Sequence, residues 1–166
     1  QYTSYALYVE RSLGDQPGRY YTNYITEWRS LPAGVLIETN KFALASTNSE
    51  AIVDPYDSSR VFEVRGFPWR QFPFPPAEVT NSVPRKFFLP YIAFNSQGGL
   101  LSSDFPDDEF LPLAKGSVFY LTNNAGDPLP PDVIQPAYRE ATRTNYNLIR
   151  IDALTGRPKL EKMELQ

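Results

Sequence analysis

Acidic side chains are the main groups in this sequence that could do chemistry, because the chain of 166 residues contains no histidine and no cysteine. Without them it cannot form a Ser-His-Asp or Cys-His nucleophile, an imidazole or thiolate metal site, or a disulfide. Carboxylate pairs remain, since a glycosidase needs only two Asp or Glu side chains on opposite sides of the scissile bond. Nothing in the order of the 19 acidic residues singles out such a pair. We therefore expect a protein that is not an enzyme, and no residue is assigned as catalytic.

The densest acidic cluster consists of Asp104, Asp107, Asp108 and Glu109. Carboxylates at this density could coordinate a hard cation, because Ca²⁺ takes six to eight oxygen ligands. The cluster lacks the alternating oxygen ligands and the central glycine of an EF-hand loop. We favour a solvated loop over a cation site, and we expect neither a metal nor a cofactor.

The most distinctive segment is Phe67–Pro76, in which four aromatic rings alternate with prolines that hold the chain extended. Aromatic side chains and arginine are enriched at interface centres, so the segment could contact a protein partner or a glycan. The candidate contact residues are Trp69, Arg70, Phe72 and Phe74. The alternative is a long loop that folds over an open sheet and fills the core with its rings. We favour this alternative, because four exposed rings would promote aggregation.

The charge balance excludes another class of function. The chain has 16 basic and 19 acidic residues, for a formal net charge of −3, and no basic stripe that could bind phosphates. We therefore expect no nucleic-acid partner. The sequence contains no run of about 18 apolar residues and no signal-peptide core. It begins at Gln1 rather than Met, which indicates a processed or trimmed chain.

The elements that must position these residues are predicted to be strands, because apolar residues recur every second position and turn residues separate the runs. Thirteen of the 16 prolines lie between Ile52 and Pro136, which argues against long helices there. Segment 41–50 is predicted to be a loop or a short strand pair, and a helical turn is expected near Ala137–Arg143. The predicted strands are Thr3–Arg11 paired with Tyr20–Arg29 as a hairpin, Val35–Glu38, Phe87–Asn95 with an edge or bulge at Pro90, Gly116–Thr122, and a closing hairpin of Asn147–Asp152 with Pro158–Glu161.

The expected fold class is mainly β, with antiparallel sheets and long loops rich in proline and aromatic residues. Neither an internal repeat nor a linker divides the chain, so residues 1–166 are expected to form a single domain. In the closing hairpin, Ile149 and Ile151 should face the core while Arg150 and Asp152 face solvent or a neighbouring subunit.

Three short stretches carry a family resemblance. Tyr91–Leu100 contains an I-x-F-x-x-x-G pattern, Asn147–Arg157 contains I-x-I-x-x-x-T-G-R, and Leu31–Val35 reads L-P-x-G-V. In order and spacing they resemble type IV pilin-like proteins, in particular the minor pseudopilins of the GspH/FimT kind. The resemblance implies a β-rich, pilin-like head that follows a long N-terminal helix. That helix would lie upstream of Gln1, and counting it would make the fold α+β.

The resemblance also implies a function, a location and partners. The expected function is a structural subunit of a type IV pilus-like or type II secretion pseudopilus assembly, which acts through protein–protein contacts with other pilin or pseudopilin subunits. The expected location is the bacterial cell envelope, on the periplasmic or extracellular side, with the membrane contacted only through the N-terminal helix. The alternative is a carbohydrate-binding or adhesive β-sandwich at the cell surface, which needs exposed rings at Trp69 or at Tyr20, Tyr21 and Tyr24.

Overall fold

The structure is a computed structural model that describes residues 2–9, 23–53, 57, 59–73, 86–101, 107–124, 126, 129–134 and 147–162. Within those ranges it contains fourteen strands and one short helix, so the prediction of a mainly β chain with antiparallel sheets is confirmed. The described residues include no helix that is long and apolar enough to cross a membrane. Tyr20, Tyr21, Phe74, Asp104 and the helical turn predicted near Ala137–Arg143 lie outside the described residues.

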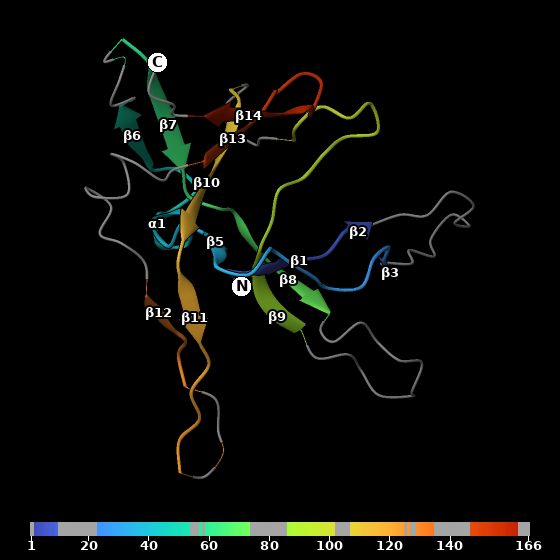
Figure 1. Ribbon diagram of the computed structural model, residues 1–166. Helices are drawn as coiled ribbons and strands as arrows, with labels where there is room; N and C mark the ends of the chain where they lie inside the picture. Colours follow the sequence, from blue (N-terminus) through green and yellow to red (C-terminus); the bar gives the residue numbers. More distant parts are fainter. Residues whose placement is uncertain are drawn as a thin grey trace, which may run out of the picture.

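The largest sheet has four strands in the order β14-β13-β10-β5, and β10 runs through the middle of the molecule (Figure 1). All three pairings are antiparallel, with Ile149 lying opposite Leu111 on one side and Leu160 on the other. The predicted third strand and the predicted C-terminal hairpin are therefore confirmed. The four strands are β5 (Val35–Ile37), β10 (Glu109–Lys115), β13 (Asn147–Ile151) and β14 (Pro158–Lys162).

A hairpin of β6 (Ser49–Val53) and β7 (Val61–Arg65) packs against this sheet and forms an apolar core with it. Ile52, Phe62 and Val64 are buried together with Leu148 of β13. The ring of Phe110 on β10 completes the cluster, with its centroid 5.5 Å from that of Phe62. Full burial of an apolar side chain of this size is worth about 1.5–3 kcal/mol, so this cluster anchors the hairpin to the sheet.

β13 departs from the predicted division into an apolar and a charged face. Ile151 is buried as expected, but Ile149 is only partly buried, and the least exposed side chain of the strand is Leu148 at 0%. Arg150, expected to face solvent, shares a face with Leu148 and donates a hydrogen bond to Asp108. Because both faces of β13 have neighbours, alternation along the strand cannot separate a core face from a solvent face.

The N-terminal part forms the predicted hairpin in two short pieces. β1 (Ser4–Tyr5) pairs with β4 (Arg29–Ser30), and β2 (Tyr8–Val9) pairs with β3 (Asn23–Tyr24). Between the two pieces, Leu7 donates its N–H to Thr26 Oγ1 at 3.0 Å and its carbonyl accepts the Ile25 N–H at 2.8 Å. The predicted continuous strand is thus interrupted, while the predicted pairing is correct.

The prediction for residues 41–50 is only partly correct, because residues 44–48 form a loop but the segment begins in a helix and contains no strand pair. Helix α1 spans Asn40–Ala43, and β6 begins at Ser49. One helical turn is too short to be stable alone, since forming it costs more conformational entropy than its few hydrogen bonds return. Tertiary contacts of Lys41, whose side chain is fully buried, therefore hold the turn in place.

The proline-rich segment is also misassigned as a loop. Trp69–Pro73 forms strand β8, which pairs with β9 (Lys86–Pro90) in a two-stranded antiparallel ribbon. β9 ends at Pro90, short of the predicted Asn95. Proline cannot donate to a ladder, but it is tolerated at the edge positions that such a ribbon offers.

A second ribbon projects from the molecule as an arm (Figure 1). β11 (Ser117–Phe119) follows β10 after the single residue Gly116 and pairs with β12 (Asp132–Ile134). Farther along, Leu129 N–H donates to the Leu121 carbonyl at 2.8 Å, so the pairing extends beyond the two strands. We call the described residues of 117–134 the arm. They confirm the central part of the strand predicted at Gly116–Thr122.

Candidate functional site

The predicted contact residues of the aromatic segment do not form one surface. Alternate residues of β8 point to opposite faces, so Trp69 and Phe72 lie on different sides of the ribbon. Trp69 and Arg70 are exposed, whereas Phe72 is buried. Phe74 lies outside the described residues. Of the three described candidates, Trp69 and Arg70 are therefore the ones accessible for contact with a partner or a glycan.

The inner face of the ribbon rests on an aromatic cluster. The ring of Phe72 lies edge-on to the rings of Tyr8 and Tyr91, with centroids 4.9 and 5.8 Å apart. The hydroxyl of Tyr24 donates to the Pro73 carbonyl at 2.9 Å, and its ring packs against Tyr8. Burial, with a smaller contribution from Tyr8, raises the pKa of Tyr24 above its ordinary value. Tyr24 is thus a packing residue rather than an exposed ring for a sugar.

The outer face combines Trp69 with residues that the sequence did not single out. Gln71 follows Trp69 on that face, and its cross-strand partner on β9 is Phe88, which is 62% exposed. Lys86, opposite Pro73, extends the same face. We call Trp69, Gln71, Phe88 and Lys86 the outer face of the ribbon. The adjacent Phe87 and Phe88 were a signal for it, but only the register of β9 against β8 assigns Phe88 to the side of Trp69.

Each of the three described members of the acidic cluster forms an ion pair within the chain. Asp107 binds Arg65 of β7 at 2.6 Å, and Asp108 binds the guanidinium of Arg150 on β13 at 2.5 Å. Asp108 also accepts the Ala153 N–H at 2.8 Å. Within the described part of the chain, no group of three or more acidic side chains is placed to hold a metal ion. These carboxylates instead tie β7 and β13 to the start of β10.

Glu109, the third member, pairs with the buried Lys41 of α1. Lys41 Nζ donates to this carboxylate and to the Arg65 carbonyl, at 2.7 Å from the latter, and lies 4.8 Å from the centroid of the Phe67 ring. Burial lowers the pKa of Lys41 below its ordinary value, and the nearby Glu109 opposes this effect. A charged group this deeply buried is costly unless paired, so Lys41 fixes how α1, β7 and β10 meet.

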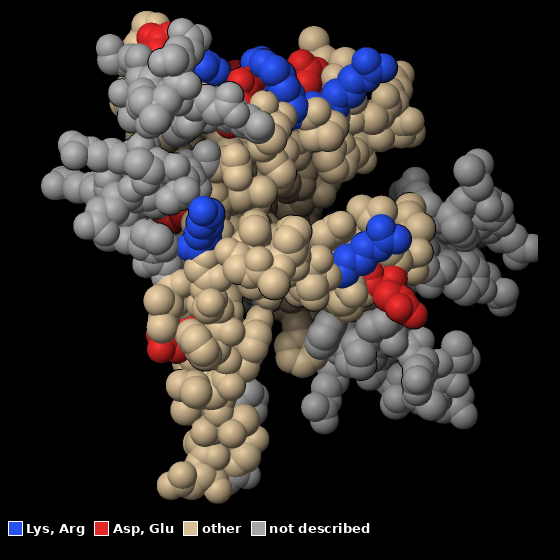
Figure 2. All heavy atoms as spheres, viewed as in Figure 1, with Lys and Arg blue, Asp and Glu red and all other residues tan. Residues whose placement is uncertain are grey.

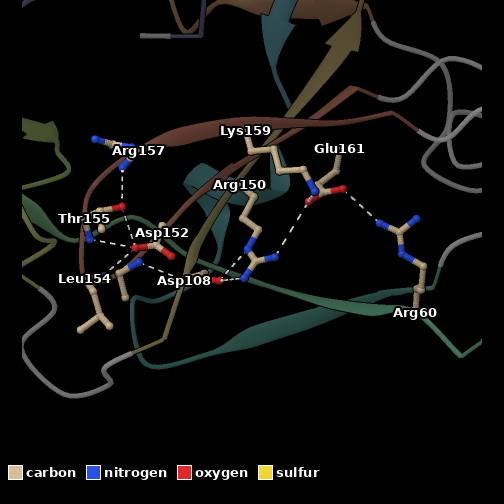
Figure 3. A network of polar contacts seen from close by, with 10 residues as sticks. Arg60, Asp108, Arg150, Asp152, Leu154, Thr155, Arg157, Lys159 and Glu161 are labelled. Carbon is tan, nitrogen blue, oxygen red and sulfur yellow. Dashed lines mark hydrogen bonds and ion pairs between the residues drawn. The ribbon is translucent and has the colours of Figure 1, made fainter.

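A second ion-pair network covers β13 and β14 (Figure 3). Glu161, whose side chain is 10% exposed, lies 2.8 Å from Lys159 and 3.1 Å from Arg60, and Arg150 lies at 4.0 Å. The hydrogen bond from Lys159 is the largest cause that lowers the pKa of Glu161. Since Arg60 immediately precedes β7, this carboxylate links the hairpin to the edge of the sheet.

Two tight turns, 94–100 and 152–156, lie against each other through their backbones, and we call them the paired turns. Leu100 N–H donates to the Ala153 carbonyl at 2.8 Å, and a Cβ on Gly156 would lie 2.0 Å from the Gly98 carbonyl oxygen. Asp152 accepts hydrogen bonds from the Thr155 N–H and hydroxyl, both at 2.8 Å (Figure 3). The turns therefore form one rigid unit, which carries the exposed side chains of Leu154 (84%) and Phe94 (48%).

Charged side chains are unevenly distributed over the visible surface. Basic and acidic side chains gather over the end of the molecule that holds β13 and β14, while the projecting arm is almost entirely uncharged (Figure 2). Among the described residues, eighteen large hydrophobic side chains are exposed, compared with nine buried hydrophobic residues. Three consecutive members of the exposed set, Phe119, Tyr120 and Leu121, lie on the arm.

Comparisons with known proteins supply no relative. No family model matches the chain, and neither the curated proteins nor the solved structures contain a significant match.

Proposed function

We propose that this chain is the head of a structural subunit in a type IV pilus-like or type II secretion pseudopilus assembly. It works through contacts with other pilin or pseudopilin subunits, needs no cofactor and catalyses no reaction. Its place is the bacterial cell envelope, on the periplasmic or extracellular side, anchored in the inner membrane or held in a filament.

The observation that carries this proposal is that exposed hydrophobic side chains stand on turns that are held in place by backbone contacts. Leu154 and Phe94 stand on the paired turns, whose hydrogen bonds and close backbone packing limit their movement. An apolar group that is already fixed in its bound position loses little entropy on association, so it makes an efficient anchor for a partner. Assembly contacts explain such a surface without any reaction chemistry.

The family resemblance supports the same proposal. The two longer stretches that carry it, Tyr91–Leu100 and Asn147–Arg157, are distant in sequence and meet in the paired turns. Sequence stretches that a family shares for a structural reason are expected to lie near each other in the folded chain. The described arrangement is therefore compatible with a pilin-like head.

The native reading frame upstream of Gln1 provides the first test. About 20 consecutive apolar residues behind a short basic leader would support the proposal, because a helix of that length spans a bilayer. An ordinary cleaved signal peptide there would contradict it.

Incorporation into filaments provides a second test in cells that produce the full-length protein. Leu154→Ser and Phe94→Ser should lower the amount of the subunit in sheared surface filaments or pseudopili, without changing its cellular level. Val53→Ser is the matched control, since Val53 is 47% exposed on β6, away from the paired turns. Equal incorporation of all three variants would show that the paired turns are not part of the assembly surface.

A carbohydrate-binding adhesin is the second candidate, and the outer face of the ribbon favours it. Trp69 and Phe88 offer apolar ring surface beside the amide of Gln71 and the ammonium of Lys86. A glycan panel with the purified chain should then show a ligand that Trp69→Ala loses at least about tenfold, an effect of about 1.4 kcal/mol. Phe94→Ala, on the paired turns, should keep the binding. A panel without any ligand would exclude this candidate.

A further inference from the structure

β11 has an edge of unusual composition for a strand of a protein in solution. Segment 117–121 reads Ser-Val-Phe-Tyr-Leu, with no charge, no proline and no glycine. On one side β11 pairs with β12, and no other strand in the described ranges pairs with it. β-branched and aromatic residues favour strands, so this edge is a ready template for a further strand.

Several other edge strands of the described part carry features that discourage pairing. β14 begins at Pro158 and continues with Lys159 and Glu161, while β9 carries Lys86 and ends at Pro90. Charges and prolines of this kind block the addition of strands. β5 is covered instead, because the Ile37 N–H donates to the Tyr2 carbonyl at 2.8 Å. Within its own arm, β12 follows two prolines and begins with Asp132, so β11 is the unprotected edge of this ribbon.

The exposed side chains of β11 set the size of a contact made through this edge. Three large apolar side chains on or directly after β11 are about half exposed or more, namely Phe119 (48%), Tyr120 (66%) and Leu121 (50%). Together they expose about 330 Å², taking about 200 Å² for a whole side chain of this kind. Two such strands would cover at most about 650 Å² in total, which is the size of a weak, reversible contact. A two-stranded ribbon is also only marginally stable by itself, so a second ribbon would stabilise it.

We propose that β11 pairs with β11 of a second copy of this chain, in antiparallel orientation across a two-fold axis. The two ribbons then form one four-stranded sheet in the order β12-β11-β11-β12. Phe119 lies at the axis opposite its own copy, and Val118 lies opposite Tyr120. Aromatic and β-branched cross-strand pairs are favourable, and Asp132 stays on the outer strands, where the two carboxylates remain apart. This pairing does not depend on the filament proposal, because it requires only the chain itself.

Sedimentation equilibrium of the purified chain, up to about 0.5 mM, tests the association. The mean mass should rise with concentration from the monomer value of 18.9 kDa toward twice that value. Phe119→Lys should keep it at the monomer value, because it places two ammonium groups opposite each other. Ile134→Lys is the matched control, with the same charge on the outer strand of the same arm, and it should still associate. A monomeric wild type, or equal loss in both variants, would overturn the proposal.

Cysteine cross-linking tests the register, and the chain has no native cysteine to interfere. Residues opposite each other in antiparallel strands have Cα atoms about 4.5–5.5 Å apart, within the range that a disulfide can bridge. Under mild oxidation, Phe119→Cys should form a linked dimer at least about tenfold faster than Leu154→Cys, because pairing raises the local thiol concentration. Leu154 is the more exposed of the two residues. Equal cross-linking rates for the two variants would mean that both dimers form by random collision, and would contradict the proposed register. Circular dichroism of each variant checks that the fold is retained.

Discussion

β10 and β11 are separated by a single residue, but they lie in opposite environments. β10 has a partner strand on each side, and Pro112 and Ala114 in its middle are buried. β11 has one partner, and both Phe119 and its neighbour Tyr120 are exposed. The same stretch of chain thus passes from the centre of a sheet to a projecting ribbon.

The difference comes from what each region brings together from distant parts of the chain. At the start of β10, Asp107, Asp108 and Glu109 form ion pairs with basic side chains on three other elements. Apolar side chains of β6, β7 and β13 pack against the same strand. The arm is made of residues close in sequence, and in the described part of the chain no other element makes extensive contact with it. A ribbon without a second layer contributes little to the stability of the monomer and leaves its apolar side chains available for a partner.

The largest expected effect concerns the ion pair between the buried Lys41 and Glu109, the first residue of β10. Lys41→Ala should lower the free energy of unfolding by about 3–5 kcal/mol, because Glu109 and the Arg65 carbonyl lose their buried donor. Urea unfolding followed by circular dichroism measures the loss. Lys86→Ala is the control, since Lys86 is exposed on β9 and its removal should change stability by no more than about 0.5 kcal/mol. Similar values for the two variants would mean that Lys41 does not organise this region.

A second prediction compares the two regions directly by truncating one aliphatic side chain in each. Leu148→Ala should cost about 2–5 kcal/mol, because Leu148 is fully buried in the core of the sheet. Ile134→Ala on the arm should cost no more than about 0.5 kcal/mol at a concentration where the chain is monomeric. Chemical denaturation of both variants provides the values. If Ile134→Ala were as costly as Leu148→Ala, the arm would be an integral part of the core.

The paired turns give a third prediction, of intermediate size. Gly156 and Gly34 both have a positive φ, of +62° and +77°, but only at Gly156 would a Cβ meet backbone atoms. Gly34→Ala should cost about 1–2 kcal/mol, the strain of the left-handed conformation alone. Gly156→Ala should cost clearly more, since turn 94–100 must also move away. Thermal unfolding of the two variants measures this difference. Equal melting temperatures would show that the turns are not in contact.

The smallest expected effect is a dependence of stability on pH at the edge of the sheet. The pKa of Glu161 in the folded chain is lowered from its ordinary value of 4.5, chiefly by the hydrogen bond from Lys159. Its contribution is therefore complete above pH 4.5 and is lost as the pH falls through the folded pKa. Unfolding free energies measured from pH 7 downward should fall less steeply for Glu161→Gln than for the wild type, and Lys159→Gln should fall between the two. Parallel curves for all three would contradict the assignment.

The sequence by itself determined the elements whose signals are local. Turn residues and two-residue alternation located the N-terminal hairpin, the strand at Val35–Ile37 and the closing hairpin, because a strand shows its period within a few residues. The absence of histidine and cysteine likewise removed whole classes of chemistry. The aromatic–proline run of Phe67–Pro76 was visible in the same way, but the sequence favoured burial of its rings, and the structure buries Phe67 and Phe72 while it exposes Trp69.

Only the tertiary structure decided which partners those elements meet. From the sequence, the three acidic residues 107–109 are predicted to lie in a solvated loop. In the structure they form ion pairs with Lys41, Arg65 and Arg150, which are distant in sequence. The burial of Leu148, the helical turn at Asn40–Ala43 and the place of Phe88 beside Trp69 depend equally on contacts between distant segments. Ion-pair and packing energies act over a few ångströms in space regardless of separation along the chain, so a single sequence carries no local mark of them.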